Sequence, residues 1–323
     1  MKRAFVTGGS GFLGGRLIEM LVERNIEVLA LARSPVAARK VEQRGARAVM
    51  GDLSRPAELA QGLEGVDVVF HAAAFLHFWG NWQDFVAAHV DGTLGMIEAA
   101  ERGGAKRVVL ISAASVVMGN LEALIDVDET APLTELRVLP YSATKALAER
   151  AGLARPNSKI TVTAVRPPLI WGPGDTFDRE LGERIRSGRF AYFNGGRYPY
   201  SVCHVDNACH GAILAAEHGR AGEAYFLADT EVTEARDFLD DRILAAGLTP
   251  PKMSVPSRVA WVMAGALEGV WRMFRLGGEP PLTREVVRLM GAPFTISLKK
   301  AEQELGYRAV VTRREALQAM KRR

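Results

Sequence analysis

Residues 4–15 read AFVTGGSGFLGG, and this stretch decides the fold. The apolar run Ala4–Thr7 passes directly into closely spaced glycines and then into a helical pattern. Glycines at such a junction allow a tight turn, bring backbone N–H groups close to a pyrophosphate and let the helix pack on a sheet. The helix N-terminus adds an anion site. The turn therefore predicts dinucleotide binding, and its residues expected at the cofactor are Gly8, Gly11, Phe12, Leu13 and Gly14.

The rest of the first half alternates between strand and helix patterns. The predicted strands are Ala4–Thr7, Ile26–Ala32, Arg47–Met50, Asp67–His71, Arg107–Ser112 and Ile160–Arg166. The predicted helices are Phe12–Arg24, Arg55–Leu63, Trp82–Glu101 and Tyr141–Leu153. This alternation indicates an α/β fold with a Rossmann-type, doubly wound parallel sheet that has helices on both faces.

The pattern becomes irregular after Arg166, with a Pro- and Gly-rich segment, an aromatic-rich stretch and further helices. The 323 residues allow one large domain with a smaller one built on it. We expect a dinucleotide-binding domain over residues 1–166 and a substrate-binding region over residues 167–323. The second region can also contribute a segment that returns to the sheet of the first.

Composition and charge exclude several classes. With 48% hydrophobic and 24% charged residues, the chain is neither disordered nor a collagen-like or disulfide-rich protein. The net charge is +4, but residues 299–323 alone carry eight Lys or Arg against three Glu. The remainder is close to neutral and shows no basic stripe, so we expect a solvated basic tail and no nucleic-acid partner.

Two further features concern cysteines and membranes. Cys203 and Cys209 lack the spacing of a zinc site or a disulfide framework, so no metal is expected.

The first residues show no signal-peptide pattern, which predicts a cytoplasmic location. The segment Val259–Phe274 is too short and too charged to span a bilayer. For this segment, ordinary packing is favoured over contact with a membrane surface.

A pair of residues with acid/base chemistry opens the last predicted helix of the first half. Residues 140–145 read PYSATK, which places Tyr141 and Lys145 at i and i+4 on one helix face. A neighbouring ammonium favours phenolate and lowers the pKa of the tyrosine toward the working pH. Such a tyrosine can move a proton to or from a substrate oxygen.

The end of the second predicted strand bears on the choice of cofactor. An acidic residue there would accept hydrogen bonds from the ribose hydroxyls of NAD, but the sequence has Ala32-Arg33-Ser34. Arg33 can pair with a 2′-phosphate, and Lys40 can add a second positive charge. NADP is therefore expected in preference to NAD.

Together these motifs resemble the extended short-chain dehydrogenase/reductase family, in the branch of the 3β-hydroxysteroid dehydrogenases and dihydroflavonol reductases. The resemblance includes the TGxxGxxG turn from Thr7 to Gly14, the Tyr141-x-x-x-Lys145 pair, RPPLIWGPGD at 166–175 and HVDNA at 204–208. It runs from about residue 3 to the C-terminus.

The resemblance implies further cofactor contacts. Asp52, with Leu53 beside it, would accept a hydrogen bond from the adenine amino group, and Lys145 would bind the nicotinamide ribose. The small residues that close the fourth strand would let the cofactor lie on the backbone, and the segment after Arg166 would pass the nicotinamide carboxamide. The residues concerned are Ala72, Ala73, Ala74, Pro167 and Ile170.

The sequence departs from the family pattern at two places. The family's Ser or Thr that polarises the substrate carbonyl falls on Ala114, or on Ala113 after a shift of one residue, and neither can donate a hydrogen bond. Ser112 or Ser115 can substitute, and Ser112 is preferred because it lies nearer the strand end. His89 stands where the family commonly has Asn.

Aromatic residues gather in the segments expected around the substrate: Phe75, Phe78, Trp79, Trp82, Trp171, Phe190, Tyr192, Phe193, Tyr198 and Tyr200. Large flat side chains suit an apolar ligand with few polar groups. We therefore expect a nicotinamide-dependent oxidoreductase that interconverts a ketone and a secondary alcohol on a steroid-, flavonol- or 3-oxoalkanoate-like molecule.

Two other functions stay open. A sugar-nucleotide epimerase or dehydratase would share the first half and could bind its diphosphate through four arginines: Arg184, Arg186, Arg189 and Arg197. A non-catalytic NADP sensor would account for the missing family serine. The oligomeric state is also open, a homodimer included.

Overall fold

The glycine turn joins β1 (Arg3–Thr7) to α1 (Phe12–Val22) and lies against the end of β4 (Val68–His71). Gly8 has a φ of +71°, and a Cβ there would lie 2.7 Å from the carbonyl oxygen of Ala72. A Cβ on Gly14 would collide with the carbonyl oxygen of Gly8. Because backbone atoms cannot rotate aside as side chains do, both positions require glycine.

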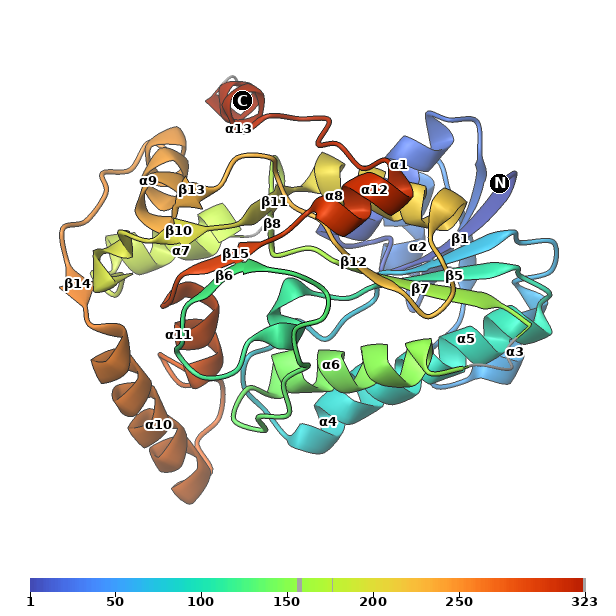
Figure 1. The fold of residues 1–323 in the computed structure, drawn as a ribbon. Helices are drawn as coiled ribbons and strands as arrows, with labels where there is room; N and C mark the ends of the chain where they lie inside the picture. Colours follow the sequence, from blue (N-terminus) through green and yellow to red (C-terminus); the bar gives the residue numbers. More distant parts are fainter. Residues whose placement is uncertain (156–158, 176, 322–323) are drawn as a thin grey trace.

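Seven parallel strands form the central sheet, in the order β12-β7-β5-β4-β1-β2-β3 (Figure 1). The computed structural model describes residues 1–155, 159–175 and 177–321. The remaining strands of the sheet are β2 (Glu27–Ala32), β3 (Arg47–Met50), β5 (Arg107–Ile111), β7 (Thr161–Arg166) and β12 (Ala224–Phe226). All six predicted strands lie in it, each end within one residue of the prediction. The doubly wound α/β class is confirmed, and β12 brings the chain back to the sheet from its second half.

Helices cover both faces of this sheet (Figure 1). One face carries α1, α2 (Pro35–Glu42), α8 (Val205–His218) and α12 (Lys299–Leu305). The other carries α3 (Pro56–Gln61), α5 (Gly92–Arg102) and α6 (Pro140–Leu153). Successive residues of one strand serve opposite cores, with Phe5 buried on the α5 side and Val6 on the α1 side. This double burial explains why the strands read as continuous apolar runs.

A smaller region beside the sheet is built from segments far apart in the sequence (Figure 1). Its four-stranded sheet has the order β13-β10-β15-β6, and β8 pairs with β11 and β9 with β14. The strands are β6 (Leu124–Val127), β8 (Leu169–Trp171), β9 (Tyr192–Phe193), β10 (Pro199–Tyr200), β11 (Val202–His204), β13 (Thr233–Glu234), β14 (Ser254–Val255) and β15 (Phe294–Ile296). The helices are α7 (Phe177–Arg186), α9 (Ala235–Ala245), α10 (Ser257–Met273), α11 (Arg284–Met290) and α13 (Arg313–Lys321), with short 3₁₀ turns at Ala114–Val117 and Asn194–Gly196.

The predicted helix Trp82–Glu101 is interrupted. It consists of α4 (Trp82–Val86), a π-helical turn over Ala87–Asp91, and α5. The wider turn places His89 on the buried side, where its ring has two hydrogen-bond partners. Such π turns occur often at functional sites.

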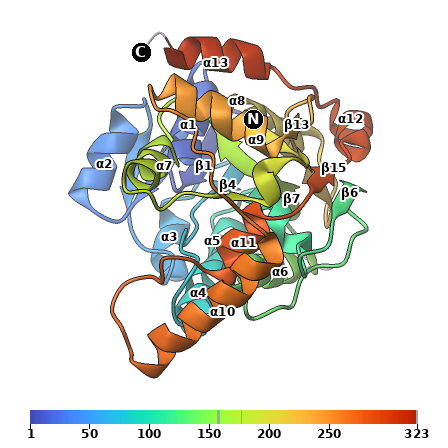
Figure 2. The same cartoon turned by 90° about the vertical axis from the view of Figure 1, so that its left-hand side faces the viewer.

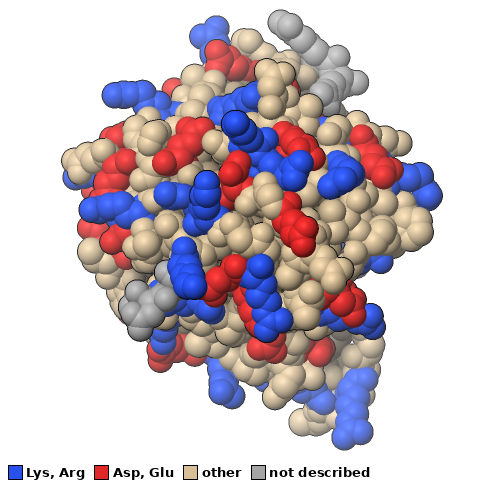
Figure 3. All heavy atoms as spheres, turned by 90° about the vertical axis from the view of Figure 1, so that its right-hand side faces the viewer, with Lys and Arg blue, Asp and Glu red and all other residues tan. Residues whose placement is uncertain are grey.

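The basic C-terminus is not a solvated tail, so that expectation was wrong. Residues 299–321 form α12 and α13, which are tied to the body by ion pairs of Lys300 with Glu223 at 2.6 Å and of Arg313 with Asp241 at 2.5 Å. These two acidic partners lie 77 and 72 residues upstream, where a local charge count does not find them. Figure 3 shows Lys and Arg interspersed with Asp and Glu over one face of the molecule.

The expected packing of residues 259–274 was also wrong for most of their length. In α10, only Ser257, Ala260, Ala264 and Glu268 are buried. The helix projects from the body, as Figures 1 and 2 both show. The helical periodicity of the sequence identified this helix. It did not show that most of the apolar side chains on the helix would be exposed.

The glycine turn generates a stability prediction. Gly14→Ala should destabilise the protein by about 1–3 kcal/mol, because the added methyl forces the backbone at Gly8 to move. Gly119→Ala is the matched control, since a Cβ there meets nothing within 4 Å, and it should change stability by less than about 0.5 kcal/mol. Urea unfolding measures both, and equal midpoints for the two variants would contradict the steric argument.

Candidate active site

A cleft of about 2310 Å³ lies at the carboxyl ends of the central strands. The first residue after β1, β2, β4 and β5 lines it in each case: Gly8, Arg33, Ala72 and Ser112. In doubly wound sheets this edge is where ligands bind. A single small-molecule site has a volume of about 300–1,000 Å³. The cleft therefore has room for a dinucleotide and an organic substrate together.

The glycine turn forms the floor of one end of the cleft. Every residue expected at the cofactor lines the cleft except Lys145, which is buried. The missing Cβ atoms of Gly8 and Gly14 leave bare backbone at the N-terminus of α1, as a pyrophosphate requires. The residues present thus fit a dinucleotide.

A second helix N-terminus faces the same end. Ser34 caps α2 by accepting a hydrogen bond from the Ala37 N–H at 3.2 Å. Arg33 precedes this terminus, Lys40 lies in the last turn of α2, and both are exposed to solvent where they line the cleft. Two cations and a helix N-terminus make this corner suitable for an anionic group.

Asp52 lies between this corner and the sheet. Its carboxylate accepts a hydrogen bond from the Ser54 N–H at 2.9 Å, and this contact lowers the pKa of Asp52. The nearby positive charges of Arg33 and Arg55 act in the same direction. Asp52 is therefore ionised and can accept a hydrogen bond at neutral pH.

The chain after β4 is fixed by side chains beneath it. The Thr7 hydroxyl accepts a hydrogen bond from the Ala73 N–H at 3.0 Å and also bonds Nδ1 of His71 at 3.0 Å. Burial, together with the positive charge of Lys145, lowers the pKa of His71 to about 3. His71 is neutral at physiological pH and supports the backbone that lines the cleft.

Tyr141 and Lys145 project from α6, as their spacing predicts. The Tyr141 ring packs edge-on against Phe78 and His89, with ring centres 5.7 Å and 5.5 Å away. The Lys145 ammonium donates a hydrogen bond to the carbonyl oxygen of Ile111 at 2.7 Å. Burial lowers the pKa of Lys145 to about 8, while the charge of Glu149 opposes this shift.

The pKa of Tyr141 differs from the expectation. Burial raises it above its ordinary value, and the charge of Glu285 raises it further. The Lys145 ammonium does not offset this shift, and it donates its hydrogen bond to the carbonyl oxygen of Ile111. Tyr141 is accordingly protonated at neutral pH, the form that can donate a proton to a carbonyl oxygen.

His89 connects the chain after β4 to the catalytic helix. Its Nε2 accepts a hydrogen bond from the Phe75 N–H at 3.1 Å, which leaves the proton on Nδ1. Nδ1 donates to the Thr144 hydroxyl at 2.9 Å, and that hydroxyl donates to the carbonyl oxygen of Pro140 at 2.6 Å. Burial and the charge of Lys145 lower the pKa of His89 to about 3. The ring is a neutral link between two walls of the site.

Glu285 is a site residue that the sequence analysis missed. Its buried carboxylate accepts hydrogen bonds from the backbone N–H groups of Tyr141 and Ser142, at 3.2 Å and 3.3 Å, and from the Ser142 hydroxyl at 2.5 Å. It therefore caps the N-terminus of α6, where a negative charge is favourable. Burial nevertheless raises the pKa of Glu285 to about 7. The two segments are 144 residues apart, so no local pattern could have revealed the contact.

The hydroxyl expected to polarise a carbonyl has two candidates. Ser112 and Ser115 both line the cleft, and within the described residues neither buried hydroxyl has a hydrogen-bond partner. Ala113 also lines the cleft, whereas Ala114 is buried in the core of the smaller region. The methyl group at the family position therefore faces away from the cleft.

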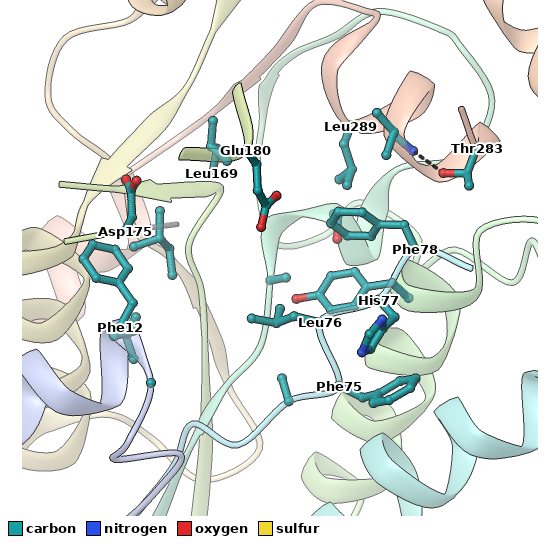
Figure 4. Close-up of a pocket in the computed structure, with 18 of the residues that line it drawn as sticks. Phe12, Phe75, Leu76, His77, Phe78, Leu169, Asp175, Glu180, Thr283 and Leu289 are labelled. Atoms are coloured by element: carbon teal, nitrogen blue, oxygen red, sulfur yellow. Dashed lines mark hydrogen bonds between the residues drawn. The ribbon is translucent and has the colours of Figure 1, made fainter. Parts of the chain in front are cut away.

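The other end of the cleft is mainly apolar (Figure 4). Phe75, Leu76, His77 and Phe78 come from the chain after β4, and Leu289 lies across the space from them (Figure 4). Of the predicted aromatic cluster, seven residues line the cleft: Phe75, Phe78, Phe190, Tyr192, Phe193, Tyr198 and Tyr200.

The other predicted side chains have different places. Trp171 is buried in the core, where its indole N–H donates to Asp229 at 2.8 Å. Of the four predicted arginines, Arg184 and Arg189 line the cleft. Arg197 is exposed and pairs with Glu234 at 2.8 Å.

The sheet, the glycine turn and the Tyr141–Lys145 face define an extended short-chain dehydrogenase/reductase. A crystal structure of the protein gox2253 superimposes with a TM-score of 0.78 at 28% identity and covers 98% of this chain and 96% of that one. A dTDP-glucose 4,6-dehydratase from Streptomyces venezuelae, solved with NAD, shares the fold with a TM-score of 0.77 at 22% identity, over 99% of this chain and 96% of that one.

The chain belongs to the 3-beta hydroxysteroid dehydrogenase/isomerase family, whose profile matches residues 5–256. A ketoreductase of Stigmatella aurantiaca, named for a 4-hydroxy-2-methyl-3-oxo-4-farnesyl-3,4-dihydroquinoline-1-oxide, is 40% identical over 99% of this chain and 96% of its own length. A 2-alkyl-3-oxoalkanoate reductase of Stenotrophomonas maltophilia is 34% identical over 99% and 98%. The protein is thus a nicotinamide-dependent oxidoreductase that acts on CH–OH or C=O groups. None of its helices in the described ranges is long and apolar enough to cross a membrane.

The buried carboxylate of Glu285 generates a prediction about pH. Between about pH 4.5 and pH 7, unfolded Glu285 loses its proton while the folded protein keeps it, so stability falls as the pH rises. Glu285→Gln keeps the shape and removes the titration. The unfolding free energy of the wild type, relative to this variant, should fall by on the order of 2–3 kcal/mol across this range.

Urea unfolding at about pH 5 and pH 7.5 provides the measurement. Exposed Glu58 supplies the control, and Glu58→Gln should leave the pH dependence of the wild type unchanged. Parallel pH profiles for the wild type and Glu285→Gln would show that Glu285 titrates normally in the folded protein.

Proposed function

We propose that the protein is an NADP-preferring ketoreductase for apolar molecules that carry a ketone beside a long aliphatic chain. The observation that carries this proposal is the position of Tyr141, which lines the cleft between the dinucleotide end and the apolar end. The supporting similarity is to two reductases named for farnesyl- and alkyl-bearing ketones. The physiological direction proposed is reduction.

The proposed cofactor site uses the residues at the strand ends. Gly8, Gly11 and the N-terminus of α1 would hold the pyrophosphate, with Phe12, Leu13 and Gly14 beside it. Asp52 and Leu53 would meet the adenine, and the backbone of Ala72–Ala74 would lie along the cofactor. Pro167 and Ile170 would flank the nicotinamide.

NADP is proposed over NAD because of the corner at α2. Arg33, Lys40 and the capped N-terminus of this helix would together bind a 2′-phosphate. The end of β2 offers no carboxylate to accept hydrogen bonds from free ribose hydroxyls, since Ala32-Arg33-Ser34 occupy it.

The chemistry divides between cofactor and protein. A bound nicotinamide supplies the hydride. Tyr141 holds the proton for the substrate oxygen, and Ser112 donates a second hydrogen bond to that oxygen. Lys145, fixed by the Ile111 carbonyl, would bind the nicotinamide ribose, and its positive charge would stabilise the phenolate left when Tyr141 gives up its proton.

Replacement of the phenol tests the catalytic role. Tyr141→Phe should lower kcat/KM for a 2-alkyl-3-oxo acid by about 10²–10⁴-fold, with NADPH binding retained, because only the proton donor is lost. Tyr225→Phe, which removes a phenol outside the cleft, is the control and should keep its activity. Reductase activity is measured by NADPH oxidation, and Ser112→Ala and Ser115→Ala in the same assay identify the second donor. An active Tyr141→Phe enzyme would rule out this mechanism.

Replacement of the arginine tests the cofactor preference. Arg33→Ala should weaken NADPH binding by about 10- to 100-fold through loss of a charge-assisted hydrogen bond, and should leave NADH binding almost unchanged. Arg39→Ala is the control, because Arg39 is exposed on α2 but does not line the cleft. Titration by fluorescence gives the dissociation constants, and an unchanged NADPH-to-NADH ratio in Arg33→Ala would refute the assignment.

A further inference from the structure

The helix α10 is attached to the protein along one narrow stripe. Its buried residues, Ser257, Ala260, Ala264 and Glu268, follow one another at helical spacing and lie on one side. At the end of this stripe Glu268 accepts hydrogen bonds from the backbone N–H and the guanidinium of Arg284, at 2.7 Å and 2.8 Å. Met263 and Leu267 line the cleft, and most of the remaining side chains form an outer surface where the helix projects from the body (Figure 2).

That outer surface is strongly apolar. Val262 is 71% exposed, Met273 77% and Phe274 66%. Eight of the sixteen exposed large apolar side chains in the described part of the chain lie between residues 253 and 276: Met253, Val259, Val262, Met263, Val270, Met273, Phe274 and Leu276. We call these eight residues the α10 patch. An apolar concentration of this kind marks an interaction surface.

The exposed charges within residues 252–276 have a single sign, and the next carboxylate, Glu279, lies 2.8 Å from Nδ1 of His77. Lys252, Arg258, Arg272 and Arg275 are exposed. Glu268 is the one carboxylate in the sequence between residues 252 and 276, and it is buried against Arg284. An amphipathic helix that exposes apolar side chains and cations matches the boundary of a bilayer that contains anionic headgroups.

The α10 patch continues into the apolar end of the cleft. Ala260, Met263 and Leu267 line the cleft from α10. On the opposite side of its mouth Leu76, which also lines the cleft, is 70% exposed. The guanidinium of Arg272 lies 5.1 Å from the ring centre of Trp79, so the chain after β4 is in contact with α10.

We propose that α10 docks the protein on a lipid surface that contains anionic headgroups. The α10 patch lies in the boundary between headgroups and acyl chains, and the four cations contact the headgroups. The mouth of the cleft then faces the bilayer. A ligand with a long aliphatic chain passes into the cleft without crossing water, and only this last consequence rests on the proposed function.

A second copy of the chain is a poorer occupant of the same surface. In a twofold symmetric contact the same patch meets itself. Each of the four cations would then approach those of the partner helix, and the surface of α10 offers no exposed carboxylate to pair with them. Anionic headgroups satisfy both the apolar side chains and the charges.

Sedimentation with lipid vesicles tests the proposal on the full chain without any turnover. Vesicles of phosphatidylcholine with about one third phosphatidylglycerol should bind the protein, and pure phosphatidylcholine vesicles should bind it far less. The double variant Arg258→Gln with Arg275→Gln should weaken binding to the anionic vesicles by about 25-fold, from about five-fold per cation. Raising the salt to about 1 M should have a similar effect, because it screens the headgroups.

The apolar part is tested separately. Val262→Asp and Phe274→Asp should each lower binding to anionic vesicles by at least ten-fold. The matched controls are Val232→Asp and Leu244→Asp, which alter side chains with 53% and 56% exposure outside the patch and should bind like the wild type. All four positions are exposed, and an unchanged melting temperature confirms that the variants fold.

Three results would overturn the docking proposal. One is the absence of wild-type binding to anionic vesicles, and another is equal binding by wild type and α10 variants. The third is a dimer in solution that Val262→Asp and Phe274→Asp convert to a monomer while vesicle binding stays unchanged. Ketoreductase activity is measured separately, on a short-chain ketone in free solution. If the wild type shows no such activity, the proposed function is contradicted, and the vesicle-binding result is unaffected.

Discussion

The close contact between the backbones at Gly8 and Ala72 is the constraint on which the site depends. No Cβ fits between them, so the ends of β1 and β4 stand nearer than side chains would allow. Thr7, one residue earlier, uses its hydroxyl to hold the Ala73 N–H in place. The floor of the cleft at this point is consequently formed by backbone atoms. The hydrogen bond to Thr7 also fixes the position of Ala73, just before the aromatic segment that follows β4.

The helix α6, which carries Tyr141 and Lys145, is held from several sides by groups to which no direct role in the proposed chemistry is assigned. His89 forms a hydrogen bond with Thr144, the fifth residue of α6, and Glu285 accepts a hydrogen bond from the N–H of Tyr141. Farther along the helix, the buried pair of Glu149 and Arg166 joins it to β7 with an N–O distance of 2.6 Å. These contacts fix the position of the phenol before a ligand arrives, so little reorganisation remains for the reaction.

The parts of the structure that the sequence predicts are those that local spacing encodes. The apolar runs located six strands to within a residue, and the motifs led to the glycine turn and Tyr141, which line one cleft. Contacts between residues that lie far apart in the sequence could not be predicted from local spacing. The bond from Glu285 to the catalytic helix, the π turn at His89 and the ion pairs of the last two helices all depend on partners that only the fold brings together.

Arg284 and Glu285 are neighbours in the chain, yet they serve different helices. Arg284 pairs with Glu268 on α10, and Glu285 caps the helix that carries Tyr141. One peptide unit therefore couples the outermost helix mechanically to the reaction centre. Insertion or deletion of a residue between positions 268 and 284 would put the two contacts out of register together. The length of this segment is accordingly constrained in this chain, even though most of its side chains face outward.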